Sequence, residues 1–399
     1  MKEDSFSPFV VSDGDSVRLN DSKSLLIREL FARFLYCGEL VPVHSADSED
    51  VQIAHRCLAV VRDSGNGSGV SAVDAGDSGA VYRFMMALLA VTEGEWRLTG
   101  SPRLLQRPIS PLVTALRSIG ASVAPASDGW VITGRPIHAE TVTVDCSLSS
   151  QFASALLLIG PKIGLRHLVT APTVPPSAPY ITMTQRVLDS VQAGAPLRRE
   201  ADWSTAAFWY AFVRLSPDVN ALLLRDLRLN SIQGDFIISQ IFNELGVSSK
   251  QKDEGVFIEK NRGSSPHPSL NVDLQNTPDL APVLAVTAAL LGIPCTLSGL
   301  KNLNLKESHR LDVLEQVLAP IAPVVASEGT LRIYGGNMSP NVLSDPLEID
   351  TRGDHRLVLA FSLLSFKYDV YLSDIKCVRK SYPEFENYFK PTESIGKKM

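Results

Sequence analysis

Hydrophobic residues along the chain form two recurring kinds of helix-forming segment. The first kind is rich in Ala and Leu and apolar on most faces, which predicts a helix buried inside a domain. Each of these helices is expected to lead into a short strand. The predicted buried helices begin near Ser22, Gly79, Ser150, Ser204, Pro278 and Asp354. Several of the strands end alike, with RLTGS at 97–101, LLRDL at 223–227, TLSGL at 296–300 and YLSDI at 371–375. Such recurrence indicates a repeated structural unit.

The second kind of segment is amphipathic and usually ends at a Gly before a strand. Three copies are PLVTALRSIGASV (111–123), TQRVLDSVQAGAPL (184–197) and ISQIFNELGVSS (238–249), and RLDVLEQVLAPIAPVV (310–325) is a fourth with Ala-Pro as the stop. The Gly suits the position after a helix end, where the backbone is left-handed. We therefore predict about six α/β units, three in each of two domains. A polar break at 230–235 marks the middle, and the first strand, 16–19, fits either domain.

Composition adds the class of protein. With 399 residues, 45% of them hydrophobic and 20% charged, the chain fits a soluble globular protein of two or more domains. The net charge of −5 provides no global basic field, which argues against nucleic acid or an anionic membrane as partner. Any anion site must therefore be assembled locally from cations that folding brings together.

Targeting and metal signals are absent from the sequence. The first ten residues lack a basic segment followed by an apolar one, so we expect a cytoplasmic protein. The longest apolar stretch, 280–295, is too short for a membrane span and contains Pro. The five cysteines are far apart, which favours free structural thiols, and the seven histidines lack metal-ligand spacing. We expect no metal and no cofactor.

Cations stand at helix starts, where the helix dipole favours acidic residues. Lys23 lies in the first turn of the first predicted helix, and Arg356 is the second residue after Asp354 in the last unit. A basic side chain there is unfavourable unless an anion lies between it and the dipole. Two such starts in equivalent positions of a repeat favour anion binding over a chance surface charge.

More cations lie near the ends of predicted elements. Arg107 precedes a helix that begins with Pro108. Lys306 and Arg310 are four residues apart, which predicts one helical face and a repulsion that an anion would relieve. Each alone is compatible with a solvated surface charge. Together they indicate a substrate with several negative charges.

Polar residues complete the candidate site. Residues 149–151, Ser-Ser-Gln, precede an apolar helix and could cap it or bind a phosphate or a sugar-like ring. The Gly-rich loop 74–79 enters a helix in the manner of an anion cradle. Asp279 follows Thr277-Pro278 as an ordinary helix start, or it acts as a general base.

Ten short sequence motifs, several of which contain these candidate residues, follow one another along the chain. They are Ser22-Lys23-Ser24 with Arg28, DAGDSG (74–79) with Arg83, LLQRPISPLVTALRSIGA (104–121), SLSSQFASALLL (147–158), SAPY (177–180), LNSIQGD (229–235), PDLAP (278–282), LKNLNLKESHRL (300–311), GDHRLVLAFSLL (353–364) and VRKSYPEF (378–385). Together they resemble the 5-enolpyruvylshikimate-3-phosphate synthase family over nearly the whole chain.

The resemblance implies an α/β fold of two similar domains, each of three βαβαββ units, which is the inside-out α/β barrel of enolpyruvyl transferases. One domain would comprise residues 1–20 and 231–399, and residues 21–230 would form the inserted domain. The active site would lie in the cleft between them. The implied partners are the small molecules phosphoenolpyruvate and shikimate 3-phosphate, without cofactor or metal, and we expect a monomer.

The resemblance also assigns site residues. Catalytic roles would fall to Asp279, Glu307 and Lys23. The residues expected to bind shikimate 3-phosphate are Lys23, Ser24, Arg28, Ser149, Ser150, Gln151, Ser177, Tyr180, Asp279, Asn302 and Lys306. Those expected to bind phosphoenolpyruvate are Lys23, Gly79, Arg107, Gln151, Arg310, Arg356 and Lys380. The 5-hydroxyl would add to the enol carbon, and the tetrahedral intermediate would then lose phosphate.

The sequence departs from the family pattern in two motifs. The first motif usually reads P-G/A-S-K-S-x-S-N-R, whereas this chain has Asn20-Asp21 at its start and Leu26-Ile27 before Arg28. Asp77 and Ala80 stand where the glycine loop usually carries Thr. Asp77 would repel an anion if it faced the site, or would cap the helix if it turned back.

Three other functions compete with the synthase interpretation. A diverged relative could transfer the enolpyruvyl group to another acidic cyclic alcohol, and a non-catalytic protein of the same fold could only bind anions. Retention of Asp279 and Glu307 argues against pure binding. The related UDP-N-acetylglucosamine enolpyruvyl transferase is disfavoured, because it typically has Lys-Asn in the first motif and a Cys near the Arg107 region, where this chain has Lys23-Ser24 and no Cys between Cys57 and Cys146.

Overall fold

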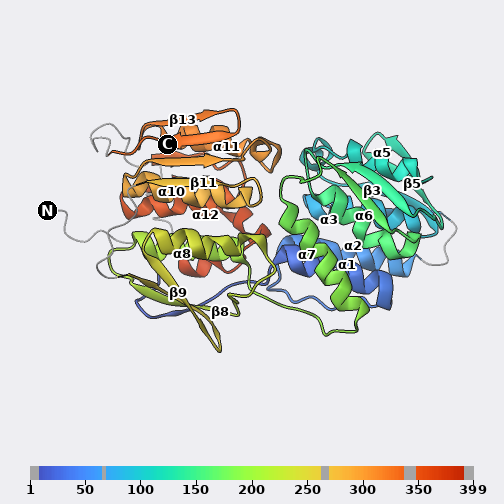
Figure 1. Cartoon of the computed structure of the whole chain (residues 1–399), viewed down its shortest axis with the longest axis horizontal. Coiled ribbons are helices and arrows are strands. Elements are labelled where there is room, and N and C mark those ends of the chain that lie inside the picture. The colour runs from blue at the N-terminus through green and yellow to red at the C-terminus, as the bar shows by residue number, and fades with distance from the viewer. Residues whose placement is uncertain (1–8, 65–68, 262–268, 337–346, 391–399) are drawn as a thin grey trace, which may run out of the picture. The chain divides into compact units, whose positions relative to one another are not determined.

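The computed structural model describes residues 9–64, 69–261, 269–336 and 347–390. The chain forms two compact units. Residues 1–20 and 200–399 form the first, called here the terminal unit because it holds both chain ends, and residues 21–199 form the inserted unit (Figure 1).

The terminal unit is a mixture of short strands and helices. Its strands are β1 (Ser16–Arg18), β8 (Ala221–Arg225), β9 (Val247–Lys252), β10 (Gly255–Lys260), β11 (Leu270–Asp273), β12 (Cys295–Ser298), β13 (Val324–Ser327), β14 (Thr330–Ile333), β15 (Leu347–Ile349) and β16 (Val370–Leu372). Its α-helices are α8 (Trp203–Leu215), α9 (Ile238–Glu244), α10 (Ala281–Leu291), α11 (Arg310–Leu318), α12 (His355–Ser362) and α13 (Phe385–Tyr388). Its 3-10 helices include η1 (Gly234–Ile237), η2 (Pro278–Leu280), η3 (Leu303–Leu305), η5 (Leu363–Phe366) and η6 (Ile375–Lys380).

The inserted unit is built from the same kinds of element. Its strands are β2 (Val70–Asp74), β3 (Gly94–Thr99), β4 (Ser122–Ala126), β5 (Gly129–Gly134), β6 (Thr141–Asp145) and β7 (His167–Ala171). Its helices are α1 (Lys23–Cys37), α2 (Glu49–Asp63), α3 (Gly79–Val91), α4 (Pro102–Leu105), α5 (Ser110–Ser118), α6 (Gln151–Ile163) and α7 (Ala178–Gln192).

The predicted βαβαββ repeat is complete in three copies among the described residues. They are β2-α3-β3-α5-β4-β5, with the short α4 between β3 and α5, then β1-α8-β8-α9-β9-β10 and β11-α10-β12-α11-β13-β14. The three sheets have equivalent orders, β2-β3-β5-β4, β1-β8-β10-β9 and β11-β12-β14-β13. In each, the first two strands are parallel and the remaining pairs are antiparallel.

Other copies are shorter than the sequence predicted. The sheets β6-β7 and β15-β16 each consist of one parallel pair in the described part of the chain. Residues 193–200 form no strand, so α7, which ends at Gln192 just before Gly194, is not followed by the expected strand. The first helix, α1, leads into α2 rather than into a strand.

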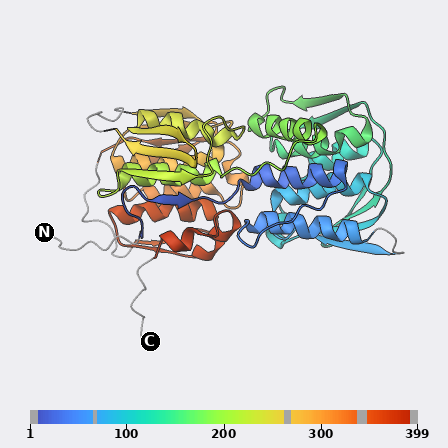
Figure 2. The ribbon, with the colours of Figure 1, turned by 90° about the horizontal axis from the view of Figure 1, so that it is seen from below.

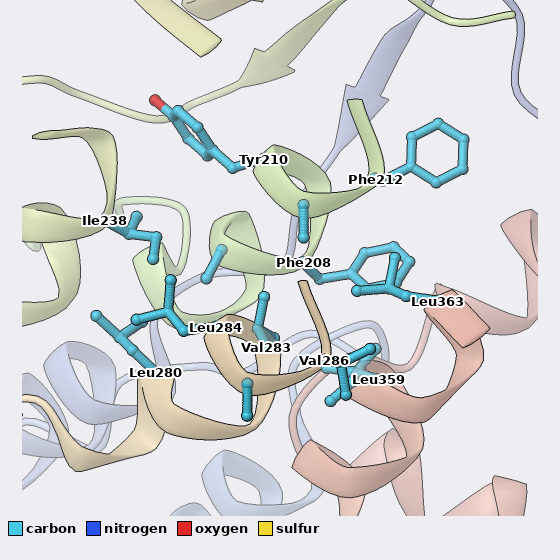
Figure 3. Packing of buried hydrophobic residues seen from close by; sticks show 14 of the residues in the cluster. Phe208, Tyr210, Phe212, Ile238, Leu280, Val283, Leu284, Val286, Leu359 and Leu363 are labelled. Atoms are coloured by element: carbon cyan, nitrogen blue, oxygen red, sulfur yellow. The ribbon is translucent and has the colours of Figure 1, made fainter. Parts of the chain in front are cut away.

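Long apolar helices are buried in the core of the terminal unit, as the absence of a polar face predicted. Phe208 of α8, Val286 of α10 and Leu359 of α12 belong to one buried cluster (Figure 3). Removing a side chain of this size from water contributes roughly 1.5–3 kcal/mol. The sheets lie outside these helices (Figure 1), and this packing holds the helix starts, where the candidate site residues stand, in fixed positions.

The chain leaves the inserted unit at Arg199–Glu200 rather than near residue 230. The position of strand β8 explains the difference. Leu224 of β8 pairs in parallel register with Val17 of β1, and β8 is an inner strand of the sheet that they share. Figure 2 shows the blue strand β1 within the terminal unit. The polar residues 230–235 are therefore a connection inside this unit and not a change of domain.

Glycines end three amphipathic helices in the expected conformation. Gly120, Gly194 and Gly246 follow the ends of α5, α7 and α9 with φ of 94°, 72° and 87°. This is the left-handed region, which Gly occupies without a steric cost. The prediction of left-handed helix ends at these Gly residues is confirmed.

Candidate active site

Arg310 is the centre of a charged cluster in the terminal unit. Its side chain is 1% exposed, and its guanidinium hydrogen-bonds three carboxylates. Nη1 donates to Asp279 Oδ1 at 2.7 Å, Nη2 to Glu307 Oε2 at 2.5 Å and Nε to Asp354 Oδ2 at 2.7 Å. A buried guanidinium requires such partners, because an unpaired charge in the interior is strongly unfavourable.

Three further cations surround the two carboxylates that the resemblance marks as catalytic. Arg356 Nη2 lies 3.1 Å and Lys306 Nζ 3.6 Å from the Asp279 carboxylate. Lys380 Nζ lies 3.8 Å from Glu307 Oε1. We call the whole group the Arg310 cluster; it comprises Asp279, Lys306, Glu307, Arg310, Asp354, Arg356 and Lys380.

Local structure places these side chains. Asp354 caps α12 by accepting a hydrogen bond from the Arg356 backbone N–H at 3.0 Å, while its carboxylate also binds Arg310. Lys306 follows η3, and α11 begins only at Arg310, so these two cations do not share a helical face. That expectation was wrong. The anion between them is the Asp279 carboxylate of the protein itself.

Electrostatics around Asp279 favour its charged form. Burial would raise the pKa of this carboxyl, but attraction by Arg356, Lys306 and Arg310 outweighs burial and holds the pKa well below its usual range. The same contacts act on Arg310, whose pKa burial would lower and whose three carboxylates raise it instead. Asp279 and Arg310 are therefore both ionised near neutral pH.

The inserted unit contains a second group of candidate residues, around Lys23. Lys23 begins α1, whose first turn contains no acidic residue. Its Nζ lies 2.9 Å from Oδ2 of Asp50, in the first turn of α2, and both side chains are mostly buried. The charge that the sequence marked as unusual for a helix start is thus matched by a carboxylate from the next helix.

Gly79 and Gln151 both contact Arg83, and Arg107 lies beside Gly79. Arg83 Nη1 donates to Gln151 Oε1 at 2.7 Å and to the Gly79 carbonyl at 3.1 Å. A Cβ at position 79 would lie 2.6 Å from Arg107 Nη1 and 2.9 Å from Arg83 Nη1, so any side chain there would displace both guanidinium groups. The start of α3 thereby carries two cations at the end of a Gly-rich loop, an arrangement suited to an anion.

Arg28 holds three helices of the inserted unit together. It is buried, and it donates to Thr184 Oγ1 at 2.7 Å, to Ser154 Oγ at 3.3 Å and to the Ser24 carbonyl at 2.7 Å. Its guanidinium also lies 5.6 Å from the centroid of the Tyr180 ring. Burial lowers the pKa of Arg28 to about 10, so it remains a cation near neutral pH.

The remaining candidates lie at element ends. Ser149 Oγ accepts a hydrogen bond from the Gln151 N–H at 3.2 Å, and the buried Ser150 precedes α6. Ser177 precedes α7 with a left-handed φ of 59°. Asn302 stands immediately before η3, in the same connection as Lys306.

Asp77, considered from the sequence as either a repelling charge or a helix cap, pairs with a neighbouring cation. Its carboxylate pairs with Arg103 and accepts a hydrogen bond from Ser101 Oγ at 2.7 Å. Ser78, the N-cap residue of α3, makes no side-chain capping hydrogen bond. The negative charge beside the glycine loop is balanced by a cation of α4.

Two carboxylates at the centre of these groups had no role assigned from the sequence. Asp50 contacts Lys23 and Asp354 contacts Arg310, each from an element distant in sequence. Arg83 belonged to a matched motif but also had no role. The sequence could have drawn attention to these residues only as charged side chains near helix starts. A helix-capping role explains such charges equally well.

Metal-binding and membrane-spanning features were also sought. Within residues 9–390, apart from the undescribed gaps, no group of three or more His, Cys, Asp or Glu could hold a metal ion. No helix in that part of the chain is long and apolar enough to cross a membrane. All five cysteines are free thiols.

Solved structures share this fold. An EPSP synthase from Acinetobacter baumannii matches with a TM-score of 0.65 and 18% identity over 95% of this chain and 96% of that chain. The enolpyruvyl transferase NikO from Streptomyces tendae matches with a TM-score of 0.63 and 14% identity over 94% of this chain and 95% of that chain. These matches confirm the predicted α/β fold.

Sequence relatives give the family. The family model described as EPSP synthase (3-phosphoshikimate 1-carboxyvinyltransferase) matches residues 53–199 and 192–389. A 3-phosphoshikimate 1-carboxyvinyltransferase of Bacteroides fragilis is 31% identical over 395 residues, covering 93% of each chain. One of Dehalococcoides mccartyi is 32% identical over 348 residues, covering 81% of this chain and 78% of the relative. The chain therefore belongs to the EPSP synthase (3-phosphoshikimate 1-carboxyvinyltransferase) family.

Proposed function

We propose that this chain transfers the enolpyruvyl group of phosphoenolpyruvate to the 5-hydroxyl of shikimate 3-phosphate and releases phosphate. Membership of the family and relatives named 3-phosphoshikimate 1-carboxyvinyltransferase support the reaction. The structural observation that carries the proposal is the Arg310 cluster, in which Asp279 and Glu307 lie among cations that suit anionic substrates.

The proposed reaction has two steps. In the first, the 5-hydroxyl oxygen bonds to C2 of phosphoenolpyruvate, the hydroxyl gives up its proton, and the methylene carbon takes up a proton. In the second, the new methyl group loses a proton, the C2–O bond to phosphate breaks, and the enol ether forms. Each step moves protons at a carbon and at an oxygen, so groups that accept and return protons are required.

Asp279 and Glu307 are the proposed proton carriers. Burial would raise the pKa of Asp279, but attraction by Arg356, Lys306 and Arg310 outweighs burial and holds the pKa low. Phosphate or carboxylate groups bound at Arg356 and Lys306 would weaken that attraction and raise the pKa toward the range useful for proton transfer. Substrate binding would thus bring the ionised carboxylate into the range where it can take up and return a proton.

The cations are proposed to hold substrate charges. Lys23, Arg107 and Gln151 of the inserted unit, with Gly79, would act on phosphoenolpyruvate together with Arg310, Arg356 and Lys380. Residues proposed to act on shikimate 3-phosphate are Lys23, Ser24, Arg28, Ser149, Ser150, Gln151, Ser177, Tyr180, Asp279, Asn302 and Lys306. Cations fixed before substrate arrives stabilise developing charge without reorganisation during the reaction.

Phosphate release tests the proposed function. The protein is incubated with phosphoenolpyruvate and shikimate 3-phosphate, and released phosphate and the enol ether product are measured. UDP-N-acetylglucosamine replaces the acceptor in the control, and Asp279→Asn serves as the matched variant. We expect acceptor-dependent phosphate release only with shikimate 3-phosphate. Absence of release while calorimetry registers binding of both substrates would refute the proposed transferase activity.

A cytoplasmic monomer is also proposed, as expected from the sequence. Light scattering coupled to size-exclusion chromatography would test the oligomeric state, and a mass matching the chain's 43.3 kDa would support the monomer. A mass twice as large would contradict it.

A further inference from the structure

Arg199 joins the two ends of the inserted unit. The unit begins at Asp21 and ends at Arg199. Arg199 Nη1 donates to Asp21 Oδ2 at 2.5 Å and to Asp47 Oδ1 at 3.0 Å. The side chains of Arg199, Asp21 and Asp47 are 26%, 22% and 6% exposed. Solvent therefore screens these ion pairs less than it screens pairs at an open surface. We call these three residues the Arg199 clasp.

The clasp lies beside the start of α1, where Lys23 stands. Asp21 is two residues before Lys23, and Asp47 is three residues before Asp50, which pairs with Lys23 Nζ at 2.9 Å. The starts of α1 and α2 thus bring three carboxylates to a short region in which Lys23 and Arg199 supply positive charge.

Asp47 is fixed in place independently of Arg199. The His44 backbone N–H donates to Asp47 Oδ2 at 2.7 Å, and the Asp47 N–H donates to the His44 carbonyl at 3.0 Å. This closed turn keeps the carboxylate at the start of α2. Loss of the Arg199 charge would therefore leave the Asp47 charge at the start of α2, three residues before Asp50, rather than allow it to move into solvent.

Hydrogen bonds within the clasp favour the charged form of Arg199. Burial would lower the pKa of Arg199, but its hydrogen bonds to Asp47 and Asp21 outweigh burial and raise the pKa. Asp21 also occupies a position where the family's first motif usually carries Gly or Ala, so its carboxylate is a departure that this chain balances with Arg199.

We propose that Arg199 is a positioning residue for the reaction. By neutralising Asp21 and Asp47, it leaves Lys23 paired with Asp50 and preserves the Lys23 charge for the anionic substrate. This inference rests on the proposed role of Lys23 and adds a residue to the site. Without Arg199, two more carboxylates would compete with substrate for Lys23 and repel the substrate's negative charges.

Kinetics of Arg199→Met, Asp21→Gly and the double variant test the proposal. Arg199→Met should raise KM for phosphoenolpyruvate about fivefold or more while kcat falls less, because repulsion acts on anion binding. Adding Asp21→Gly should recover most of the loss, and Arg199→Lys should stay near wild type. A merely structural role predicts a lower active fraction, with reduced kcat and unchanged KM. An unchanged KM in Arg199→Met, or no recovery in the double variant, overturns the proposal.

Arg97→Met is the matched control. It removes another Arg–Asp ion pair of the inserted unit, Arg97–Asp128, which shares no residue with the clasp. Its KM should equal that of the wild type. If Arg199→Met does not fold, Arg199→Gln removes the same charge and keeps a polar hydrogen-bonding group, so it takes the place of the Met variant.

Chemical labelling of Lys23 separates this inference from the proposed function. The rate at which an amine-reactive reagent modifies Lys23, read by peptide mass spectrometry, needs no substrate. Carboxylates released from Arg199 would engage the Lys23 ammonium and hinder the reagent, so labelling at a fixed pH should slow in Arg199→Met and recover in the double variant. If labelling follows this pattern but the wild-type protein has no transferase activity, the proposed function is refuted and the proposed effect of Arg199 on Lys23 stands. Equal labelling rates in wild type and Arg199→Met refute the clasp.

Discussion

Arg310 joins Asp279 to Glu307 through one buried guanidinium, with Nη1–Oδ1 of 2.7 Å and Nη2–Oε2 of 2.5 Å. The two acids therefore have a fixed relation to each other before substrate binds. Asp354 completes the arrangement from the start of α12. Arg310, expected from the resemblance to bind phosphoenolpyruvate, thus also holds the two proposed proton carriers.

Replacement of Arg310 should strongly destabilise the terminal unit. Arg310→Met would leave Asp279, Glu307 and Asp354 without their shared partner, and breaking a buried pair costs about 3–5 kcal/mol. Urea unfolding measures the loss. Arg352→Met is the control, because Arg352 and Asp350 are 56% and 55% exposed and such a pair contributes about 0–1 kcal/mol. Equal losses in the two variants would contradict the prediction.

Asp279→Asn should lower kcat far more than it changes substrate affinity. The substitution keeps the size of the side chain and removes its capacity to accept a proton, and proton transfer typically contributes about 10²–10⁴-fold. Steady-state kinetics measure kcat, and Asp350→Asn is an exposed control in the same unit. A kcat within about threefold of wild type, on the order of 0.7 kcal/mol in barrier, would exclude Asp279 as a proton carrier.

Periodicity in the sequence predicted the parts of the fold that depend on local patterns. Apolar segments marked the starts of α3, α6 and α8 to within a residue or two, and Gly marked the ends of three amphipathic helices. Burial and backbone conformation act over one or two helical turns, so single segments carry these signals. The predicted domain change near residue 230 is wrong because β1 pairs with β8. These strands are about two hundred residues apart in sequence, and periodicity does not encode such a pairing.

Among the candidate site residues, too, the sequence revealed those with a local signal and missed those defined by distant contacts. Lys23 and Arg356 were visible as cations at helix starts. Their partners were not, because Asp50 and Asp279 reach them from other elements. Arg199 gave no local signal at all, since its role depends on the two ends of the inserted unit meeting in space. Contacts between distant segments thus account for most of what sequence reasoning missed.

Arg103 should protect the glycine loop from the charge of Asp77. Since Asp77 pairs with Arg103, Asp77→Thr should leave phosphoenolpyruvate affinity within about twofold and cost at most about 1 kcal/mol of stability. Arg103→Met should weaken binding several-fold, because it leaves the carboxylate beside Gly79 without this cation, and Asp77→Thr should restore affinity. Calorimetric titration of phosphoenolpyruvate into the shikimate 3-phosphate complex decides. Much tighter binding by Asp77→Thr alone would mean that Asp77 repels the substrate.

Asp235 is a buried carboxyl at the start of η1. Its Oδ2 accepts a hydrogen bond from Ser204 Oγ, and its Oδ1 is buried without a hydrogen-bond partner in the described structure. Burial raises the pKa of Asp235 to about 6, against the attraction of Arg356 and with a smaller repulsion from Asp279. Below about pH 6 the folded protein therefore holds this side chain mainly in its protonated form.

The raised pKa of Asp235 gives a pH dependence of stability with a defined sign. The unfolded chain releases this proton near pH 3.8 and the folded protein near pH 6, so the contribution of Asp235 to the free energy of unfolding falls as pH rises between those values. A difference of roughly two pKa units corresponds to about 3 kcal/mol at most. Asp235→Asn keeps an acceptor for Ser204 and cannot ionise, so its stability relative to wild type should rise by about 2 kcal/mol between pH 4 and pH 7. Urea unfolding of both proteins across this range measures the difference, and the comparison at pH 4, where both side chains are neutral in the folded state, is the internal control. A difference that stays constant with pH, or that falls, would mean that Asp235 is ionised in the folded protein and that Arg356 outweighs its burial.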